Sequence, residues 1–198
     1  MTTLVTGFEP FGSWPVNPSA EVARALSDVA VTAVLPVDFV ECPRILRGLL
    51  VEHRPDIVLC LGLSAGSTAV EWERVAINLI DAAIPDNVGN QLVDEPVVPG
   101  GPDAFFTTLP VKTIVSAIAA DGLPATLSLS AGTYGCNEVM YAALEWASRQ
   151  PESSRPRCGF AHLPLSDDMS LADQERAIRI ALGVAGEDDQ SWPGGRLA

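Results

Sequence analysis

Residues 56–63, DIVLCLGL, form a continuous apolar run that starts directly after Pro55. Turn-forming residues bound this run on both sides, a pattern typical of strands buried on both faces of a sheet. The preceding stretch, residues 42–54 (CPRILRGLLVEHR), has apolar residues at helical spacing, namely Ile45, Leu46, Leu49 and Leu50. We therefore expect a helix that ends before Pro55 and leads into a central, buried strand.

The same alternation extends in both directions along the chain. Upstream, residues 3–7 and 29–37 have strand patterns, and a helix is expected after Asn17, with Pro18 at its first position. Downstream, the expected elements are a strand at 125–130, a helix beginning near Cys136, a strand at 157–165 and a helix at 171–184. Alternating strands and helices predict an α/β fold with a mostly parallel sheet and right-handed crossovers.

A chain of 198 residues, 47% hydrophobic and 19% charged, is expected to form one domain with a substantial core. We assign residues 1–185 to this domain and residues 186–198, which hold few apolar anchors, to a loose tail. Residues 81–110 are rich in Pro, Gly, Asn and Asp and are too long for an ordinary connection. Such a segment is usually functional or mobile.

The formal net charge of -13 argues against nucleic-acid and anionic-membrane partners, because binding to phosphates needs clustered cations. The N-terminus lacks the basic start of a secretory signal, and no run approaches the roughly 18 apolar residues that a membrane helix needs. A cytoplasmic protein is expected. The glycine-rich sequence at 62–67, GLSAGS, matches neither phosphate-binding motif and is interpreted as a tight turn after a buried strand.

Cys136 is the best candidate for a reactive group. It follows the small-residue turn AGTYG and opens a helix, where unpaired N–H groups and the helix dipole favour a thiolate. The other cysteines, Cys42, Cys60 and Cys158, fit the ordinary role of small buried hydrophobes. No CxxC spacing indicates a zinc site, so no metal is expected.

A thiol nucleophile needs a base, and the chain has two histidines. His53 lies at the polar end of a helix, whereas His162 lies in an apolar run toward the carboxyl end of a strand, where ligands gather in open α/β sheets. An acidic group that orients the imidazole could be Glu71 or Glu73, which share one face of a strand. Spacing alone does not choose between these two carboxylates.

Seven stretches in order along the chain resemble the pyroglutamyl peptidase I family, also called pyrrolidone-carboxylate peptidases. They are VTGFEPFGSWPVNPS (5–19), RPDIVLCLG (54–62), ERVAIN (73–78), IPDNVGNQ (84–91), GGPDAFFTTLPVK (100–112), SAGTYGCN (130–137) and GFAHLPL (159–165). The resemblance implies a single three-layer α/β/α domain around a twisted sheet. It further implies hydrolysis of peptides with an N-terminal pyroglutamyl residue, no cofactor, and assembly as dimers or tetramers.

Position by position, the resemblance makes Cys136 the nucleophile, His162 the base and Glu73 the acidic member. It also implies an apolar slot for the uncharged lactam ring, with Asn17 as a polar contributor and Phe8, Phe11, Ile84 and Tyr134 as lining residues.

Several positions depart from the commonest bacterial pattern. Leu63 and Ala83 replace a Gln and an Arg that lie near the reacting carbonyl, which shifts oxyanion stabilisation toward backbone groups. Gly135 replaces a Val beside the nucleophile, Val37 replaces a Thr, and Glu138 replaces a His. These changes leave two further hypotheses open: a hydrolase of the same fold for another lactam, amide or ester, and a pyroglutamyl-binding protein without catalysis.

Overall fold

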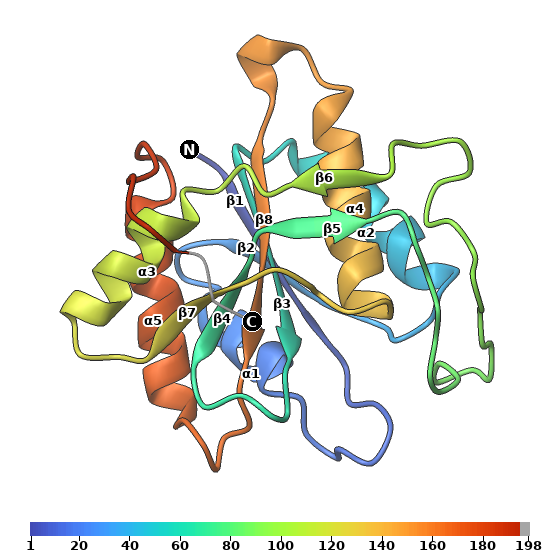
Figure 1. The fold of residues 1–198 in the computed structure, drawn as a ribbon, viewed down its shortest axis with the longest axis horizontal. Coiled ribbons are helices and arrows are strands. Elements are labelled where there is room, and N and C mark those ends of the chain that lie inside the picture. Colours follow the sequence, from blue (N-terminus) through green and yellow to red (C-terminus); the bar gives the residue numbers. More distant parts are fainter. Residues whose placement is uncertain (195–198) are drawn as a thin grey trace.

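The computed structural model describes residues 1–194, and within them six strands form one sheet (Figure 1). Across the sheet the order is β2 (Val31–Leu35), β1 (Thr3–Phe8), β3 (Ile57–Leu63), β8 (Arg157–Leu163), β4 (Val70–Glu73) and β7 (Ala125–Ser128). Neighbouring strands run parallel except β4 and β8, which are antiparallel. The predicted mostly parallel α/β sheet is confirmed.

Helices cover both faces of the sheet, which gives the three layers (Figure 1). On one face lie α1 (Pro18–Ala25), α3 (Val111–Ala120) and α5 (Leu171–Val184), and on the other lie α2 (Glu41–His53) and α4 (Gly135–Ser148). A short 3-10 helix, Glu152–Ser154, follows α4. Every residue of β3 is buried, as expected for a central strand packed from both sides.

Helix α1 begins where the sequence predicts. Asn17 is its N-cap, with the side-chain oxygen accepting from the Ser19 N–H, and Pro18 occupies the first turn, where its missing N–H costs nothing. The predicted helix at 171–184 is α5. The strand predicted at 125–130 ends at Ser128, because the Ser130 N–H bonds to the Ser128 hydroxyl instead of to a neighbouring strand.

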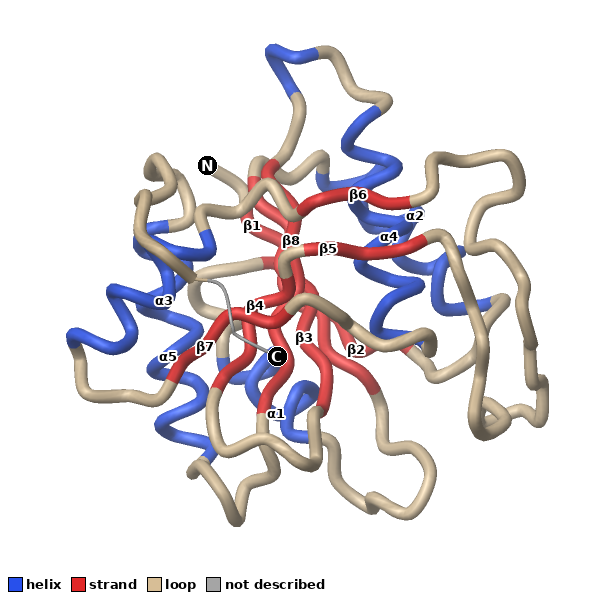
Figure 2. The backbone as a smooth tube through the Cα atoms, viewed as in Figure 1, coloured by secondary structure: helices blue, strands red, loops and turns tan. Residues whose placement is uncertain are grey.

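The long segment at 81–110 contains one strand that the sequence does not predict. β6 (Ala104–Phe106) pairs antiparallel with β5 (Val75–Ile77), and the chain between them is the long loop in Figure 2. Asp86 ties this loop to the body of the domain, because its carboxylate accepts from the N–H groups of Phe39, Val88 and Asn90. These bonds lower the pKa of Asp86 against the opposing effect of burial.

The last described residues contact α3. The Asp189 carboxylate accepts from the backbone N–H groups of Lys112 and Thr113 at 2.8 and 3.1 Å, and the Lys112 ammonium donates to the Trp192 carbonyl. The division into a domain at 1–185 and a tail at 186–198 stays a prediction, and residues 195–198 lie outside the described part of the chain.

Candidate active site

The candidate catalytic residues meet at the carboxyl ends of β3 and β8, beside the start of α4. Gly62 and His162 are register partners on these two strands. A Cβ at Gly62 would lie 2.7 Å from the Cys136 Sγ and 2.7 Å from the Phe160 ring, so the missing side chain leaves the space that the sulfur occupies. Phe160 supports the imidazole from the same strand, with ring centroids 4.9 Å apart.

His162 is oriented by a buried carboxylate. Its Nδ1 lies 2.8 Å from Oε1 of Glu73, and the two residues are 8% and 0% exposed. Glu71 is the register partner of His162 across the β4–β8 pair, yet the bond is formed by Glu73, which lies diagonally opposite. In residues 1–194 the second oxygen of Glu73 has no hydrogen-bond partner. The carboxylate therefore acts on the imidazole alone.

The surroundings of His162 favour its charged form. Burial by itself would lower the pKa of the imidazole, but the negative charge of Cys136 and hydrogen bonds to Cys136 and Glu73 outweigh burial and raise it. These contacts therefore stabilise the imidazolium form of His162. An imidazolium next to a cysteine sulfur can protonate a leaving group, as hydrolysis by a thiol nucleophile requires.

The four cysteines are all free, and three of them are buried. Burial raises the pKa of Cys60 to about 12, and it also raises the pKa of Cys42 and of Cys158. These thiols stay protonated and inaccessible. Cys136 is half-buried and lies beside His162, so it is the sulfur that a substrate can reach.

The first turn of α4 presents backbone donors next to the sulfur. Its N-cap, Tyr134, makes no side-chain cap bond, and the first helical bond runs from the Glu138 N–H to the Tyr134 carbonyl. Within residues 1–194 the N–H groups of Gly135, Cys136 and Asn137 have no partner. Free N–H groups at a helix start suit a developing oxyanion.

Asn137 fixes the position of this helix start. Its side-chain oxygen accepts from the Ile77 N–H at 2.9 Å, and its amide nitrogen donates to the carbonyls of Ile77 and Leu79 at 2.9 Å each. All of its side-chain bonds go to β5 and the residues after it. The candidate nucleophile Cys136 is therefore held in place by contacts far from it in the sequence.

A narrow apolar cleft with a cavity volume of about 10 Å³ lies beside Cys136. This is far below the roughly 300–1,000 Å³ of most small-molecule sites, so the walls of the cleft must part to admit even a small ring. The cleft brings together most of the residues proposed for substrate binding, and its full lining is Phe8, Phe11, Asn17, Val37, Leu63, Tyr134, Gly135 and Cys136.

Ile84 is placed differently from the other proposed contacts. It is 41% exposed and is not among the residues that line the cleft. Its Cδ1 lies 3.7 Å from the position of a Cβ at Gly12, in the loop after β1. In this structure Ile84 packs at the edge of that loop.

Two polar residues of the cleft are held by bonds of their own. The Tyr134 hydroxyl donates to the Pro85 carbonyl at 3.1 Å, and its ring packs against Phe11 and Phe39. Asn17 uses its oxygen as the cap of α1 and donates from its nitrogen to the Glu9 carbonyl. Both side chains are thus fixed before any substrate binds.

Sequence reasoning missed three residues that shape this site. Gly62 belongs both to the apolar run at 56–63 and to the predicted turn at 62–67 but has no predicted role, although a glycine inside a buried apolar run is itself a sign of a close approach. Val37 lines the cleft. No local signal identifies Asn137, because its bonding partners are about 60 residues away in the sequence.

Comparison with known proteins identifies the family. A profile of the family described as pyroglutamyl peptidase matches residues 1–186. The chain belongs to the pyroglutamyl peptidase family. A pyrrolidone-carboxylate peptidase from Pyrococcus furiosus is 44% identical over 95% of this chain and 99% of that protein. Another from Clavibacter michiganensis is 42% identical over 90% of this chain and 85% of its own length.

A solved structure agrees with the family assignment. Pyroglutamyl peptidase I from Bacillus amyloliquefaciens superposes with a TM-score of 0.91 at 38% identity, covering 96% of this chain and 99% of its own. The resemblance predicted from seven short stretches and the predicted three-layer fold are both confirmed.

Proposed function

We propose that this protein is a cysteine peptidase that removes an N-terminal pyroglutamyl residue from peptides. The observation that supports this proposal most strongly is that Cys136, His162 and Glu73 form a hydrogen-bonded series beside a small apolar cleft. The chain that holds them belongs to the pyroglutamyl peptidase family. The names of its relatives support the same activity. Its membership of this family confirms the prediction of a peptidase.

Each residue of the series has a defined part in the proposed reaction. The Cys136 thiolate attacks the carbonyl that joins pyroglutamate to the next residue, and His162 protonates the departing amine, which leaves a thioester on the sulfur. His162 then takes a proton from water, which releases pyroglutamate and restores the thiolate. Glu73 holds the imidazole through Nδ1, so that the other ring nitrogen exchanges the proton.

The developing oxyanion is stabilised by the unpaired N–H groups at the start of α4. Leu63 lines the cleft and Ala83 is an exposed small residue, so neither position supplies a side-chain donor. Backbone donors are preorganised and need no reorientation during the reaction. In this proposal the backbone N–H groups alone stabilise the oxyanion, to which a Gln or Arg side chain at position 63 or 83 would otherwise contribute.

Recognition of the lactam ring uses the apolar walls of the cleft. Phe8, Phe11 and Tyr134 line it, and Gly135 leaves open space, since a Cβ there would meet only Phe8 at 3.9 Å. An uncharged five-membered ring needs no charged partner. Ile84 would contribute only if the loop that carries it moved toward the cleft when substrate binds.

Three further properties are proposals of the same kind. A homo-oligomer, as a dimer or tetramer, and a cytoplasmic location rest on the family resemblance. The domain boundary near residue 185 is supported by a family match that ends at residue 186. Within residues 1–194 the helices are too short or too polar to cross a membrane.

Release of a fluorescent amine from L-pyroglutamyl-aminomethylcoumarin tests the function directly. Under reducing conditions we expect turnover that is abolished by prior treatment with iodoacetamide. Preferential hydrolysis of prolyl or glutaminyl anilides would instead indicate another substrate class. Binding of pyroglutamate by folded, reduced protein without any turnover would contradict the proposal and indicate a binding protein.

A further inference from the structure

A second cavity, larger than the catalytic cleft, lies between α2 and α4. It encloses about 370 Å³, and its walls are largely apolar, with Phe39, Leu46, Leu92, Pro96, Ala142 and Trp146 among them. None of its lining residues belongs to the catalytic cleft. The cavity lies beyond Phe39 and Tyr134, whose rings pack edge to face at 5.1 Å.

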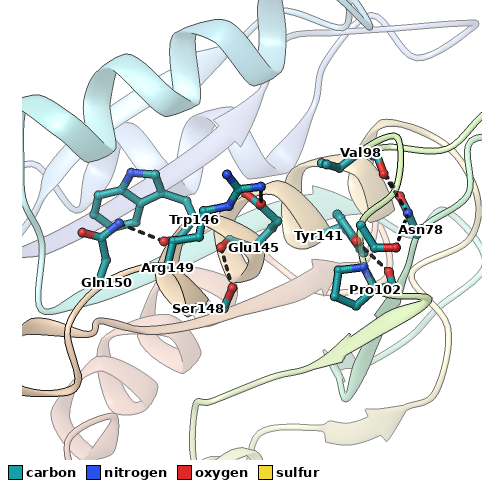
Figure 3. A network of polar contacts seen from close by, with 10 residues as sticks. Asn78, Val98, Pro102, Tyr141, Glu145, Trp146, Ser148, Arg149 and Gln150 are labelled. Carbon is teal, nitrogen blue, oxygen red and sulfur yellow. Dashed lines mark hydrogen bonds and ion pairs between the residues drawn. The ribbon is translucent and has the colours of Figure 1, made fainter.

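The walls of this cavity are held in place by hydrogen bonds. Figure 3 shows Asn78 bonded to Val98, whose N–H donates to the Asn78 oxygen at 2.8 Å and whose carbonyl accepts from the amide nitrogen at 2.9 Å. On α4, Glu145 is paired with Arg149 in the same view. A cavity with fixed walls is preorganised for a ligand.

One polar group faces this apolar space without a partner. Glu138 lines the cavity and is 4% exposed, and within residues 1–194 no other side chain or backbone group bonds to its carboxyl group, whose oxygens are reached by water only through the cavity. In a largely apolar cavity, water is a poor substitute for a fixed hydrogen-bonding partner of a carboxyl group. A ligand that donates a hydrogen bond would satisfy it.

Glu138 belongs to this cavity and not to the catalytic site. It follows Cys136 by two residues on α4, and side chains two apart on a helix do not share a face. The sulfur lines the catalytic cleft, whereas the carboxyl group lines the cavity toward α2. The catalytic cleft and the cavity therefore lie on different faces of the first turn of α4.

The charges around Glu138 favour a cation. Burial first, and then the carboxylates of Asp38 and Asp86, raise its pKa to about 8. The negative potential that opposes ionisation of Glu138 would attract an ammonium group. Two other groups that interact with Glu138, Cys42 of α2 and Tyr134, have raised pKa values and are uncharged at neutral pH. Glu145, which also lines the cavity, is paired with Arg149.

The two arginines that line the cavity do not change this conclusion. Arg44 and Arg47 are exposed, and Arg44 is paired with Glu41 at 2.6 Å. Water and salt screen exposed charges much more than buried ones. Among the described charged residues that line the cavity, Glu138 is the one that is both buried and unpaired, so it is the group that a ligand would meet.

We propose that the cavity between α2 and α4 binds a small primary ammonium compound with an apolar body, its ammonium group bonded to Glu138. The apolar walls bury the body of the ligand, and the carboxylate satisfies its charge. Binding converts Glu138 from a neutral acid to a carboxylate. Near neutral pH the complex therefore forms with release of a proton.

Calorimetric titration with 2-phenylethylamine tests this proposal, with 2-phenylethanol as the uncharged analogue of the same shape. The protein is first alkylated at Cys136 to block the catalytic cleft. We expect the amine to bind roughly tenfold or more tightly than the alcohol, since hydrogen bonds between charged groups are the stronger ones. We also expect the measured enthalpy to depend on the buffer, reporting a released proton at pH 7.

Matched variants locate the binding. Glu138→Gln keeps the shape of the side chain and should weaken amine binding roughly tenfold or more and abolish proton release. Glu152→Gln, an equal change of charge on an exposed residue away from the cavity, should bind like the parent protein. Ala142→Leu fills the cavity and should block both ligands, which keeps the test available if Glu138→Gln does not fold.

Several results would overturn the proposal. These are equal affinities for amine and alcohol, equal binding by the Glu138→Gln and Glu152→Gln variants, or no binding of the amine by the parent protein. Binding that is lost on alkylation of Cys136 would place the amine in the catalytic cleft and would also refute it. Because peptidase activity is not read out, failure here leaves the proposed function unaffected.

Discussion

Cys136 differs from the other three cysteines in its surroundings and not in its chemistry. Burial keeps the thiols of Cys42, Cys60 and Cys158 protonated, while Cys136 is half-buried, opens a helix and touches His162. The same functional group is thus protonated and inaccessible at three positions and accessible beside a histidine at one, where we propose that it reacts. The reactivity of a cysteine is a property of its position.

Replacing the sulfur tests that assignment. Cys136→Ser should abolish peptidase turnover, because a serine hydroxyl is not ionised by this imidazole, and should change the free energy of unfolding by less than about 1 kcal/mol. Turnover of the fluorescent substrate and urea unfolding measure the two effects. Cys42→Ala, which removes a buried thiol, should retain activity per folded molecule. Activity lost in Cys42→Ala but kept in Cys136→Ser would mean that the wrong sulfur is assigned.

A single-residue substitution can also test which of Glu71 and Glu73 orients His162. Glu73→Gln should lower kcat by roughly two or more orders of magnitude, because an amide at 2.8 Å from Nδ1 permits the wrong tautomer and no longer stabilises the imidazolium. Glu71→Gln is the matched control, two residues away on the same strand, and should change kcat only slightly. Steady-state kinetics of both variants decide the matter, and the reverse order of effects would refute the pairing.

At the scale of elements, β3 and α4 approach each other closely at one glycine. Gly62→Ala would place a Cβ 2.7 Å from the Cys136 Sγ, and neither the helix nor the Phe160 ring can retreat easily. We expect kcat/KM to fall by about 100-fold, as for other displacements of a reacting group by about 1 Å. The assay is turnover of the fluorescent substrate with the circular dichroism spectrum as a check on folding.

Gly135→Ala is the control for that variant on the facing helix. There the new Cβ would meet only Phe8, at 3.9 Å, which is ordinary contact. Activity should stay within a few-fold of the parent, and the free energy of unfolding should rise by about 0.5 kcal/mol, because alanine restricts the unfolded chain. Equal losses in the two variants would show that space for the sulfur is not what Gly62 provides.

Helix α3 receives its cap from the other end of the chain. Its own N-cap is Pro110, which makes no side-chain bond, and Asp189 instead accepts from two N–H groups of the first turn. Asp189→Ala should lower the free energy of unfolding by about 1 kcal/mol, the usual contribution of a capping carboxylate. Urea unfolding measures it. Asp188→Ala, whose side chain makes no such bond, should be close to neutral, and equal effects would contradict the capping role.

At the scale of the whole molecule, the buried Glu138 makes stability depend on pH. Its pKa is raised from 4.5 to about 8 in the folded protein, chiefly by burial, so the folded state binds more protons than the unfolded state between these values. The free energy of unfolding should therefore fall as pH rises from about 4.5 to 8, by at most on the order of 5 kcal/mol.

Unfolding in urea across this pH range, for the parent protein and Glu138→Gln, isolates the contribution of Glu138. The difference between the two curves should change steadily from pH 5 to pH 8 and level off above pH 9, because other titrating groups are common to both proteins. Parallel curves would show that Glu138 ionises in the folded protein as it does in water.

Much of the fold was predictable because its signals are local. The buried strand at 57–63 follows from one apolar run, α1 from an Asn–Pro start, and α5 from an apolar stripe over 171–184. The family resemblance likewise rests on short stretches in a fixed order. The candidate nucleophile at a helix start and the histidine at a strand end are also features of short segments. For these features the sequence by itself was sufficient.

Other features were decided only by the tertiary structure. The His162–Glu73 bond joins residues 89 positions apart, and the space beside Gly62 exists because β3, β8 and α4 converge there. The Asp189 cap on α3 and the unpartnered Glu138 in its cavity have no local signature either. The physical reason is the same in each case: hydrogen bonds, steric space and burial depend on which distant segments the fold brings within a few ångströms.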